Sequence, residues 1–246
     1  MLAERGVMSP SELAQHFGVS VMTIHRDLNE LQRRGIIVKS HGGVTPQPAG
    51  TFESTLAFRE GHMVEAKQAI AAAAADLVSS GGSVLLDDST TVSHLIPHLL
   101  ERTPLTVATN FLPNLRPLAE ADGVSLIAIG GDHDPVSDSF TGMVSLRDLA
   151  AVRVDAVFLS AAGVAGGSAW HADPQVVAVK QAMLAAAERA YLLVDHTKLG
   201  RNALHEIVEL GDVDAVVTDA DAPADALAEL HAVGVEVVVA GGSTDG

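Results

Sequence analysis

The sequence predicts an α/β protein in two parts: an N-terminal winged helix-turn-helix and a larger Rossmann-like domain with a mostly parallel sheet. Three observations lead to this prediction. Two short capped helices precede a hairpin pattern, a segment with prolines and glycine follows, and helical and apolar strand-like segments then alternate to the C-terminus. We expect domains at 1–45 and 55–246, joined by a linker at 46–54.

Length and composition limit the class of protein. A chain of 246 residues with 48% hydrophobic residues can bury a substantial core, which excludes a disordered protein. Cysteine is absent, so disulfides and thiolate chemistry are excluded. No stretch reaches the roughly 20 apolar residues of a membrane helix, and no signal-peptide pattern follows Met1. We expect a cytoplasmic protein without a membrane partner.

The formal charge of −16 is unevenly distributed. Residues 1–45 hold five Lys or Arg against four Asp or Glu, a net charge of +1, so the remainder carries −17. A strongly acidic surface repels nucleic acid. Only the N-terminal part is therefore a candidate for nucleic-acid binding.

The first predicted helix carries start and stop signals. Ser9 is a candidate N-cap, Pro10 suits the first helical position, and Glu12 can complete a capping box. Gly18 then ends the helix. Ser20 caps a second helix that runs to residue 34, and IIVKSHGGV reads as a hairpin. Two helices joined by so short a turn describe a helix-turn-helix.

The second helix has two distinct faces. At 100° per residue, Ile24, Leu28 and Leu31 form one stripe, which predicts the face that packs on the core. The opposite face could enter a major groove, with the hairpin as a wing against phosphates. An amphipathic helix of a protein-interaction domain explains the same pattern, so both interpretations stay open here. The candidate DNA-binding residues are Ser20, Met22, Thr23, His25, Arg26, Asn29, Arg33, Lys39 and His41.

Residues 12–44, ELAQHFGVSVMTIHRDLNELQRRGIIVKSHGGV, resemble the winged helix of DeoR-type bacterial transcription regulators. They match the family pattern ELA..F.VS..TIRRDL..L...G...R.HGG at nearly every fixed position. His25 and Lys39 stand where the family usually or often has arginine, and the family's first helix is reduced to MLAERGV. The resemblance implies double-stranded operator DNA as a partner.

From residue 55 the pattern alternates between helix and strand. Apolar runs without alternation imply strands covered on both faces, hence a mostly parallel sheet between helices. We expect helices at 63–79, 91–101, 111–120, 174–189 and 223–232. We expect strands at 83–88, 105–109, 124–130, 155–160, 190–195, 214–219 and 235–240.

Small or polar residues follow the first three of these strands. The carboxyl ends of parallel strands meet at one edge of a sheet, where ligands of such sheets bind. Hydroxyls and N–H groups at a helix start can hold a phosphate, although the same residues cap helices routinely. Lysines near this edge could add positive charge or be ordinary surface residues. The candidate effector residues are Asp87, Ser89, Thr90, Thr91, Thr109, Asn110, Gly130, Gly131, Gly163, Lys180, Asp195 and Lys198.

The segment 67–219 is similar to the DeoR-type effector domain, whose signatures are D.GTT, TN, GG, K..M and D.SK.G. They occur here at 87–91, 109–110, 130–131, 180–183 and 195–200, with Ser89 in place of the usual glycine. The resemblance implies a phosphorylated sugar as the effector. It also implies a fold related to ribose-5-phosphate isomerase.

An enzyme therefore has to be weighed. Sugar isomerisation needs a general base, and the isomerases carry an acidic DGAD-like run where this chain has Ser160-Ala-Ala-Gly-Val164. We predict a homo-oligomeric repressor of carbohydrate genes, controlled by a phosphorylated sugar, without catalytic residues, cofactor or metal. Two alternatives remain: an isomerase-like enzyme with a vestigial N-terminal domain, and a regulator whose sensor has lost its ligand and acts by oligomerisation.

Overall fold

The computed structural model describes residues 7–33, 37–40, 43–46 and 56–241. By its contacts the chain divides into two compact units, residues 1–62 and 63–246. The predicted linker falls mostly on residues 47–55, which lie outside the described residues. Among the described residues, no helix is both long and apolar enough to cross a bilayer.

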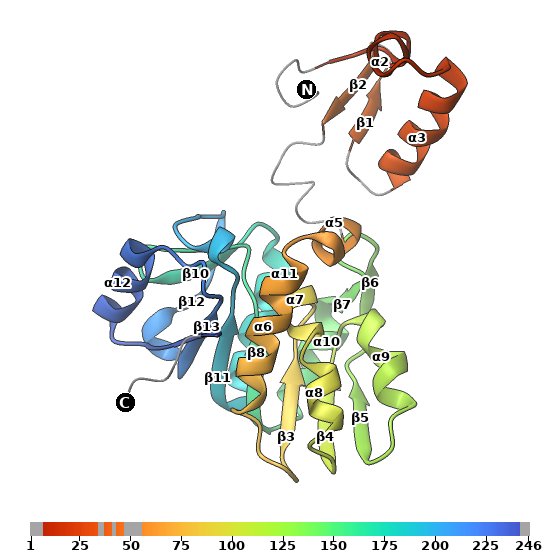
Figure 1. Cartoon of the computed structure of the whole chain (residues 1–246). Helices are drawn as coiled ribbons and strands as arrows, with labels where there is room; N and C mark the ends of the chain where they lie inside the picture. The colour runs from red at the N-terminus through yellow and green to blue at the C-terminus, as the bar shows by residue number, and fades with distance from the viewer. Residues whose placement is uncertain (1–6, 34–36, 41–42, 47–55, 242–246) are drawn as a thin grey trace. The chain divides into compact units, whose positions relative to one another are not determined.

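The N-terminal unit contains the predicted helix-turn-helix and hairpin (Figure 1). Helix α2 (Pro10–Phe17) starts with the predicted capping box: Ser9 Oγ accepts from Glu12 N at 3.2 Å, and Glu12 Oε2 accepts from Ser9 N at 2.6 Å. Gly18 ends it in the left-handed region at φ 67°. Helix α3 (Val21–Arg33) is capped by Ser20, whose Oγ accepts from Thr23 N at 3.1 Å.

The hairpin pairs strand β1 (Ile37–Ser40) with β2 (Gly43–Pro46) in antiparallel register. Strand β2 runs one residue past the predicted domain end at 45, because Pro46 pairs with Ile37. Met8 adds a third segment to this small sheet: its N donates to Val44 O at 3.0 Å and its O accepts from Val44 N at 2.7 Å.

The predicted inner face of α3 packs as expected. Ile24 and Leu28 are buried with Met8, Ile37 and Val44, and other members of the same core lie on α2. We expect Leu28→Ala to cost about 2–5 kcal/mol of the stability of this unit, because a cavity replaces a fully packed side chain. Thermal unfolding of the full chain should then show an early transition that the parent lacks. A single unshifted transition would contradict this packing.

The C-terminal unit is a seven-stranded sheet in which every neighbouring pair is parallel. Across the sheet the strands are β14 (Glu236–Val239), β13 (Ala215–Thr218), β11 (Ala187–Leu193), β8 (Val154–Leu159), β3 (Ser83–Leu86), β4 (Leu105–Thr109) and β5 (Val124–Ala128). The helices are α5 (Leu56–Gly61), which precedes the unit, and α6 (Val64–Ala75), α7 (Thr90–Ser93), α8 (Ile96–Leu100), α9 (Leu112–Ala119), α10 (Gly142–Ala150), α11 (Pro174–Ala185) and α12 (Ala224–Val233).

Helices cover both faces of this sheet, as the continuous apolar strands predict. Val84 and Leu86 of β3 belong to the core that includes residues of α6, α8 and α9, whereas Leu85 belongs to the core on the opposite face, with residues of α10, α11 and α12. Figure 1 shows α6 and α8 crossing in front of the strands. The predicted Rossmann-like architecture is therefore confirmed.

Three predicted helices were wrong in extent. The segment 63–79 ends as helix α6 at Ala75, four residues early. The segment 91–101 is broken into α7 and α8, because Pro97 has no N–H to continue the helical hydrogen bonds. The segment 174–189 ends as a helix at Ala185, and strand β11 already begins at Ala187, where it pairs with Val154 of β8. The alanine-rich sequence of the segment 174–189 favours a helix locally, but the pairing of β11 with β8 in the sheet ends the helix.

Several short elements were not predicted. They are α5, α10, the hairpin of β6 (Asp132–Asp134) with β7 (Ser139–Thr141), the 3₁₀ turns η1 (His196–Lys198) and η2 (Leu210–Asp212), and a small antiparallel sheet of β9 (Gly163–Ala165), β10 (Ser168–His171) and β12 (His205–Glu209). The added strands have three to five residues and little apolar alternation, so periodicity does not reveal them.

Candidate functional site

The carboxyl edge of the large sheet contains a topological switch point. Strand β3 is flanked by β4 on one side and β8 on the other, so the chain leaves β3 toward one side and later returns to the other. Open α/β sheets bind ligands outside such a point. Buried polar side chains gather at this edge: Asp87, Asp88, Ser89, Thr90, Thr91, Thr109, Asn110, Ser160, Asp195 and Asp219 all follow or end a strand.

Asp87 connects the strand ends on either side of the switch point. Its Oδ1 accepts from Ser89 N at 3.0 Å and from Ser89 Oγ at 2.6 Å. Its Oδ2 accepts from Ser160 N at 2.7 Å and from the ammonium of Lys180. The side chain is fully buried and both carboxylate oxygens are occupied, so Asp87 fixes the loop after β3 against β8 and α11.

Lys180 is buried between two carboxylates. Its Nζ pairs with Asp87 and lies 3.0 Å from Asp88 Oδ1, while Ser139 Oγ donates to Asp88 Oδ2 at 3.2 Å. Burial alone would lower the pKa of Lys180, but the charges and hydrogen bonds of Asp87 and Asp88 outweigh burial and raise it. The side chain is therefore a charged ammonium that holds two acids together rather than a nucleophilic amine.

Lys67 is a second buried lysine at this edge, and it is not among the residues predicted for the site. It lies on α6, and its Nζ donates to Thr90 Oγ1 at 2.9 Å. Burial first, and then the charge of Lys67, lower the pKa of His94, so this imidazole stays neutral near pH 7. One signal was available: Lys67, Ile70, Ala71 and Ala74 share the buried face of α6, where a lysine is unexpected.

Two buried asparagines have side-chain atoms without a hydrogen-bond partner among the described residues. Asn110 Nδ2 donates to Phe140 O at 2.9 Å, but its Oδ1 is unpaired. Asn114 Oδ1 accepts from Ser93 Oγ at 2.7 Å, but its Nδ2 is unpaired. An unpaired buried polar group costs about 1–3 kcal/mol. Such atoms mark places where a ligand or water can complete the bonding.

Two of the three predicted glycines, and Thr109, have structural explanations. At Gly131, with φ 148°, an added Cβ would lie 2.1 Å from Ser145 Oγ, and the same hydroxyl donates to Gly130 O at 2.6 Å. At Gly163, an added Cβ would lie 2.3 Å from Arg201 O. Thr109 Oγ1 accepts from Phe111 N at 3.2 Å. Gly131, Gly163 and Thr109 shape the backbone at this edge of the sheet, and a ligand contact is not needed to explain them.

Asp195 and Lys198 lie at the same edge but apart from the cluster of Asp87, Asp88 and Lys180. They follow β11, and β11 lies two strands away from β3, a separation of about 10 Å between the two strands. Asp195 Oδ1 accepts from Thr197 N at 3.0 Å and so caps η1. Lys198 is half-buried, and no ion pair joins it to another described residue.

The acidic groups near this edge act as turn caps. Among the described residues, His196, Asp219 and Asp221 bring three potential metal ligands within 4.8 Å of one another. However, Asp219 Oδ2 accepts from His196 N at 2.7 Å, and Asp219 Oδ1 lies 2.7 Å from His196 Nδ1 and 3.1 Å from Asp221 N.

Asp134 caps a turn in the same way. Burial by itself would raise the pKa of Asp134, but hydrogen bonds from Ser137 and Val136 outweigh burial, so the pKa of Asp134 is lowered.

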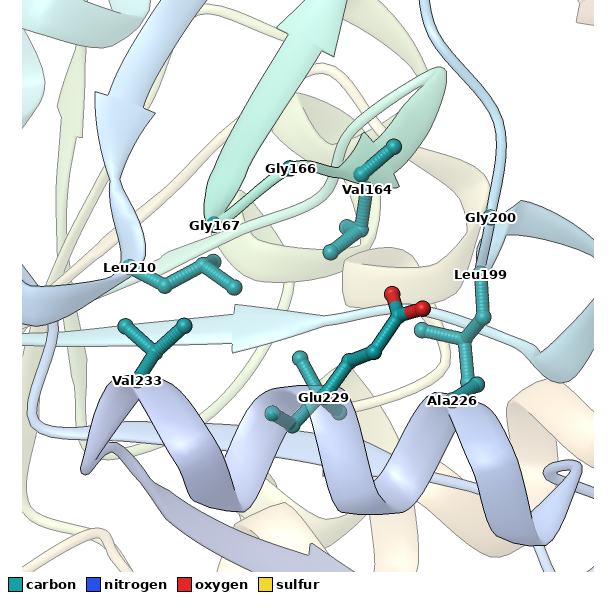
Figure 2. Close-up of a pocket in the computed structure, with 11 residues that line it drawn as sticks. Val164, Gly166, Gly167, Leu199, Gly200, Leu210, Ala226, Glu229 and Val233 are labelled. Atoms are coloured by element: carbon teal, nitrogen blue, oxygen red, sulfur yellow. The ribbon is translucent and has the colours of Figure 1, made fainter.

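A separate hollow lies between α12 and the hairpin of β9 and β10. Figure 2 shows Glu229 among apolar neighbours that include Leu199, Leu210 and Val233, with Gly166 and Gly167 at the opposite wall. None of the candidate effector residues lines it. Its one charged group is a carboxylate, so this hollow does not suit a phosphorylated ligand.

Some of the predicted DNA-binding residues are exposed, others already have a partner within the unit, and two lie at least partly outside the described residues. Met22 is 80% exposed, and His25 and Arg26 are also exposed. Thr23 is half-buried, with its Oγ1 2.9 Å from Ser20 Oγ. Asn29 accepts from the ammonium of Lys39 on the wing, so both side chains already have a partner. The side chain of Arg33 and all of His41 lie outside the described residues.

Comparison with known proteins identifies both units. The family model described as DeoR-like helix-turn-helix domain matches residues 1–47, and that described as DeoR C terminal sensor domain matches residues 62–220. The L-fucose operon activator of Haemophilus influenzae is 31% identical over 221 residues, 89% of this chain and 88% of the relative. The glycerol-3-phosphate regulon repressor of Escherichia coli is 31% identical over 224 residues, 91% of this chain and 88% of the relative.

Among solved structures, ribose 5-phosphate isomerase A from Methanocaldococcus jannaschii has 16% sequence identity and a TM-score of 0.39, covering 56% of this chain and 53% of that one. A likeness this weak says nothing about activity. The helix-turn-helix match and the regulators among the relatives favour a DNA-binding regulator over the isomerase alternative. The chain belongs to the DeoR family of transcriptional regulators.

Proposed function

We propose that the C-terminal unit binds a phosphorylated sugar at the carboxyl edge of its sheet, and that occupancy changes the affinity of the N-terminal unit for operator DNA. The observation that carries this proposal is the polar interior of this edge, with the buried Lys67 beside Thr90 and the unpaired Oδ1 of Asn110. Lysine can balance the charge of a phosphate. Unpaired amide atoms can pair with sugar hydroxyls.

The relatives support the chemical class of the effector and the genes controlled. One regulates an L-fucose operon and the other a glycerol-3-phosphate regulon. We propose a cytoplasmic repressor of carbohydrate genes that acts as a homo-oligomer on repeated sites. Linkage requires that the effector bind the DNA-competent and the released states with different affinities.

The cluster of Asp87, Asp88 and Lys180 offers the enzyme alternative no free carboxylate. Asp87 and Asp88 both pair with Lys180, and Asp87 has hydrogen-bond partners on both oxygens. A general base must be within reach of a substrate proton. Ala161 and Ala162 offer none in the segment that follows β8.

Effector binding by the full chain tests this function. A panel of sugar phosphates is screened by thermal shift, and hits are measured by isothermal titration. We expect Thr91→Val and Lys198→Met to weaken the best binder about 10- to 100-fold, the loss of a hydrogen bond to a charged group. Operator affinity without effector should stay near that of the parent, because both residues lie in the other unit.

Glu229→Gln, in the separate hollow, is the matched control and should leave effector affinity unchanged. Parental affinity in both Thr91→Val and Lys198→Met would show that the effector site is assigned wrongly. A chain that binds no member of the panel would instead support a sensor that has lost its ligand and acts by oligomerisation.

A further inference from the structure

The first turn of α3 presents apolar side chains to solvent. Met22 is 80% exposed and Val21 is 42% exposed, and they are neighbours at the start of the helix. Single exposed apolar residues need no explanation. Here, however, they occupy the end of the recognition helix that contacts base edges in helix-turn-helix proteins.

The polar groups nearby are already engaged. The hydroxyls of Ser20 and Thr23 lie 2.9 Å apart, and Ser20 Oγ also accepts from Thr23 N to cap the helix. Asn29 accepts from Lys39, so its amide oxygen is not free for a base. These contacts within the unit compete with base contacts by the same atoms.

The remaining exposed residues of this surface form two pairs at helical spacing. Met22 and Arg26 lie four residues apart on the outward face, and Val21 and His25 lie four residues apart beside them. The N-terminal half of the surface is thus apolar and the next turn is polar, about 6 Å further along the helix.

The major groove offers one apolar group to such a surface. Each base pair shows a pattern of donors and acceptors there, and thymine alone adds a C5-methyl group. We propose that Met22, supported by Val21, contacts the methyl group of a thymine in each half-site, so that this chain selects that base by apolar contact. The inference rests on the DNA-binding function, and names what that surface reads.

Deoxyuridine substitution tests the proposal, because uracil differs from thymine only by the missing methyl. A duplex is first selected with the full chain from a random library, and each thymine of the enriched site is replaced in turn. We expect one position per half-site at which affinity falls about four-fold, the effect of one buried methyl group. Met22→Ala should bind the thymine and uracil duplexes equally.

Two controls make the result specific to Met22. Phe17→Ala also removes an exposed apolar side chain, 60% accessible on α2, and should keep the parent's sensitivity to uracil. At the sensitive position, 5-methylcytosine should be bound more tightly than cytosine by the parent and not by Met22→Ala. Circular dichroism confirms that both variants are folded.

The outcomes separate the two proposals. Selection that enriches no sequence would overturn the DNA-binding function and the inference with it. An enriched site at which every uracil substitution is neutral would overturn the apolar contact and leave the function intact. A uracil effect that persists in Met22→Ala would also overturn the assignment, because another residue would then contact the methyl group.

Discussion

Lys180→Met is expected to lower the free energy of unfolding of the C-terminal unit by about 3–5 kcal/mol, the cost of breaking a buried ion pair by removing one partner. The lysine side chain is 3% exposed, and its ammonium holds Asp87 and Asp88 together. Without it, two carboxylates remain in the interior with no cation between them. Lysine and methionine side chains are of similar length, so most of the loss reflects charge rather than a cavity.

Urea unfolding of the full chain, followed by circular dichroism, measures this loss. Arg147→Met is the matched control: it breaks an ion pair of 2.8 Å with Asp148, but the arginine side chain is 74% exposed. Exposed pairs contribute about 0–1 kcal/mol, so this variant should unfold nearly as the parent does. Equal stability of Lys180→Met and Arg147→Met would mean that the buried cluster does not carry the charges assigned to it.

The same cluster shows what the sequence could predict about the site. Asp87 and Ser89 stand directly after a strand and before a helix, so order along the chain places them at the sheet edge. Lys180 was expected near this edge of the sheet, but its double pairing with Asp87 and Asp88 depends on where α11 crosses the sheet. Lys67 was missed because the alanines around it make α6 read as an ordinary buried helix.

The fold was predictable to a similar degree. The capped helices and the apolar strands carry local signals, and they occur where the sequence predicts them. The start of β11 was mistaken for helix, since its pairing with β8 is a long-range contact that no local pattern encodes. The short strands β9, β10 and β12 are likewise defined by one another rather than by their own composition.

Arg26→Ala is expected to weaken operator binding strongly without loss of stability. Its side chain is 82% exposed, and its only described ion pair, to Asp27, is long at 3.8 Å, so little holds it to the folded unit. A contact from arginine to a guanine or phosphate contributes about 1–3 kcal/mol. In the proposed oligomer the arginine contact is lost in both half-sites, so the total loss of about 2–6 kcal/mol lowers operator affinity by about 30-fold to more than 10⁴-fold. Removing an exposed side chain should change stability by no more than about 0.5 kcal/mol.

Operator titrations at several salt concentrations, with thermal unfolding beside them, check both halves of this expectation. Residues 1–45 carry a net charge of only +1, so each subunit can neutralise few phosphates. The slope of affinity against salt should be shallow for each subunit and become shallower in Arg26→Ala if the arginine contacts a phosphate. Leu28→Ala on the inner face is the counterpart, because it should lose binding only together with folding. Parental operator affinity in a folded Arg26→Ala chain would show that the outward face of α3 does not read the operator.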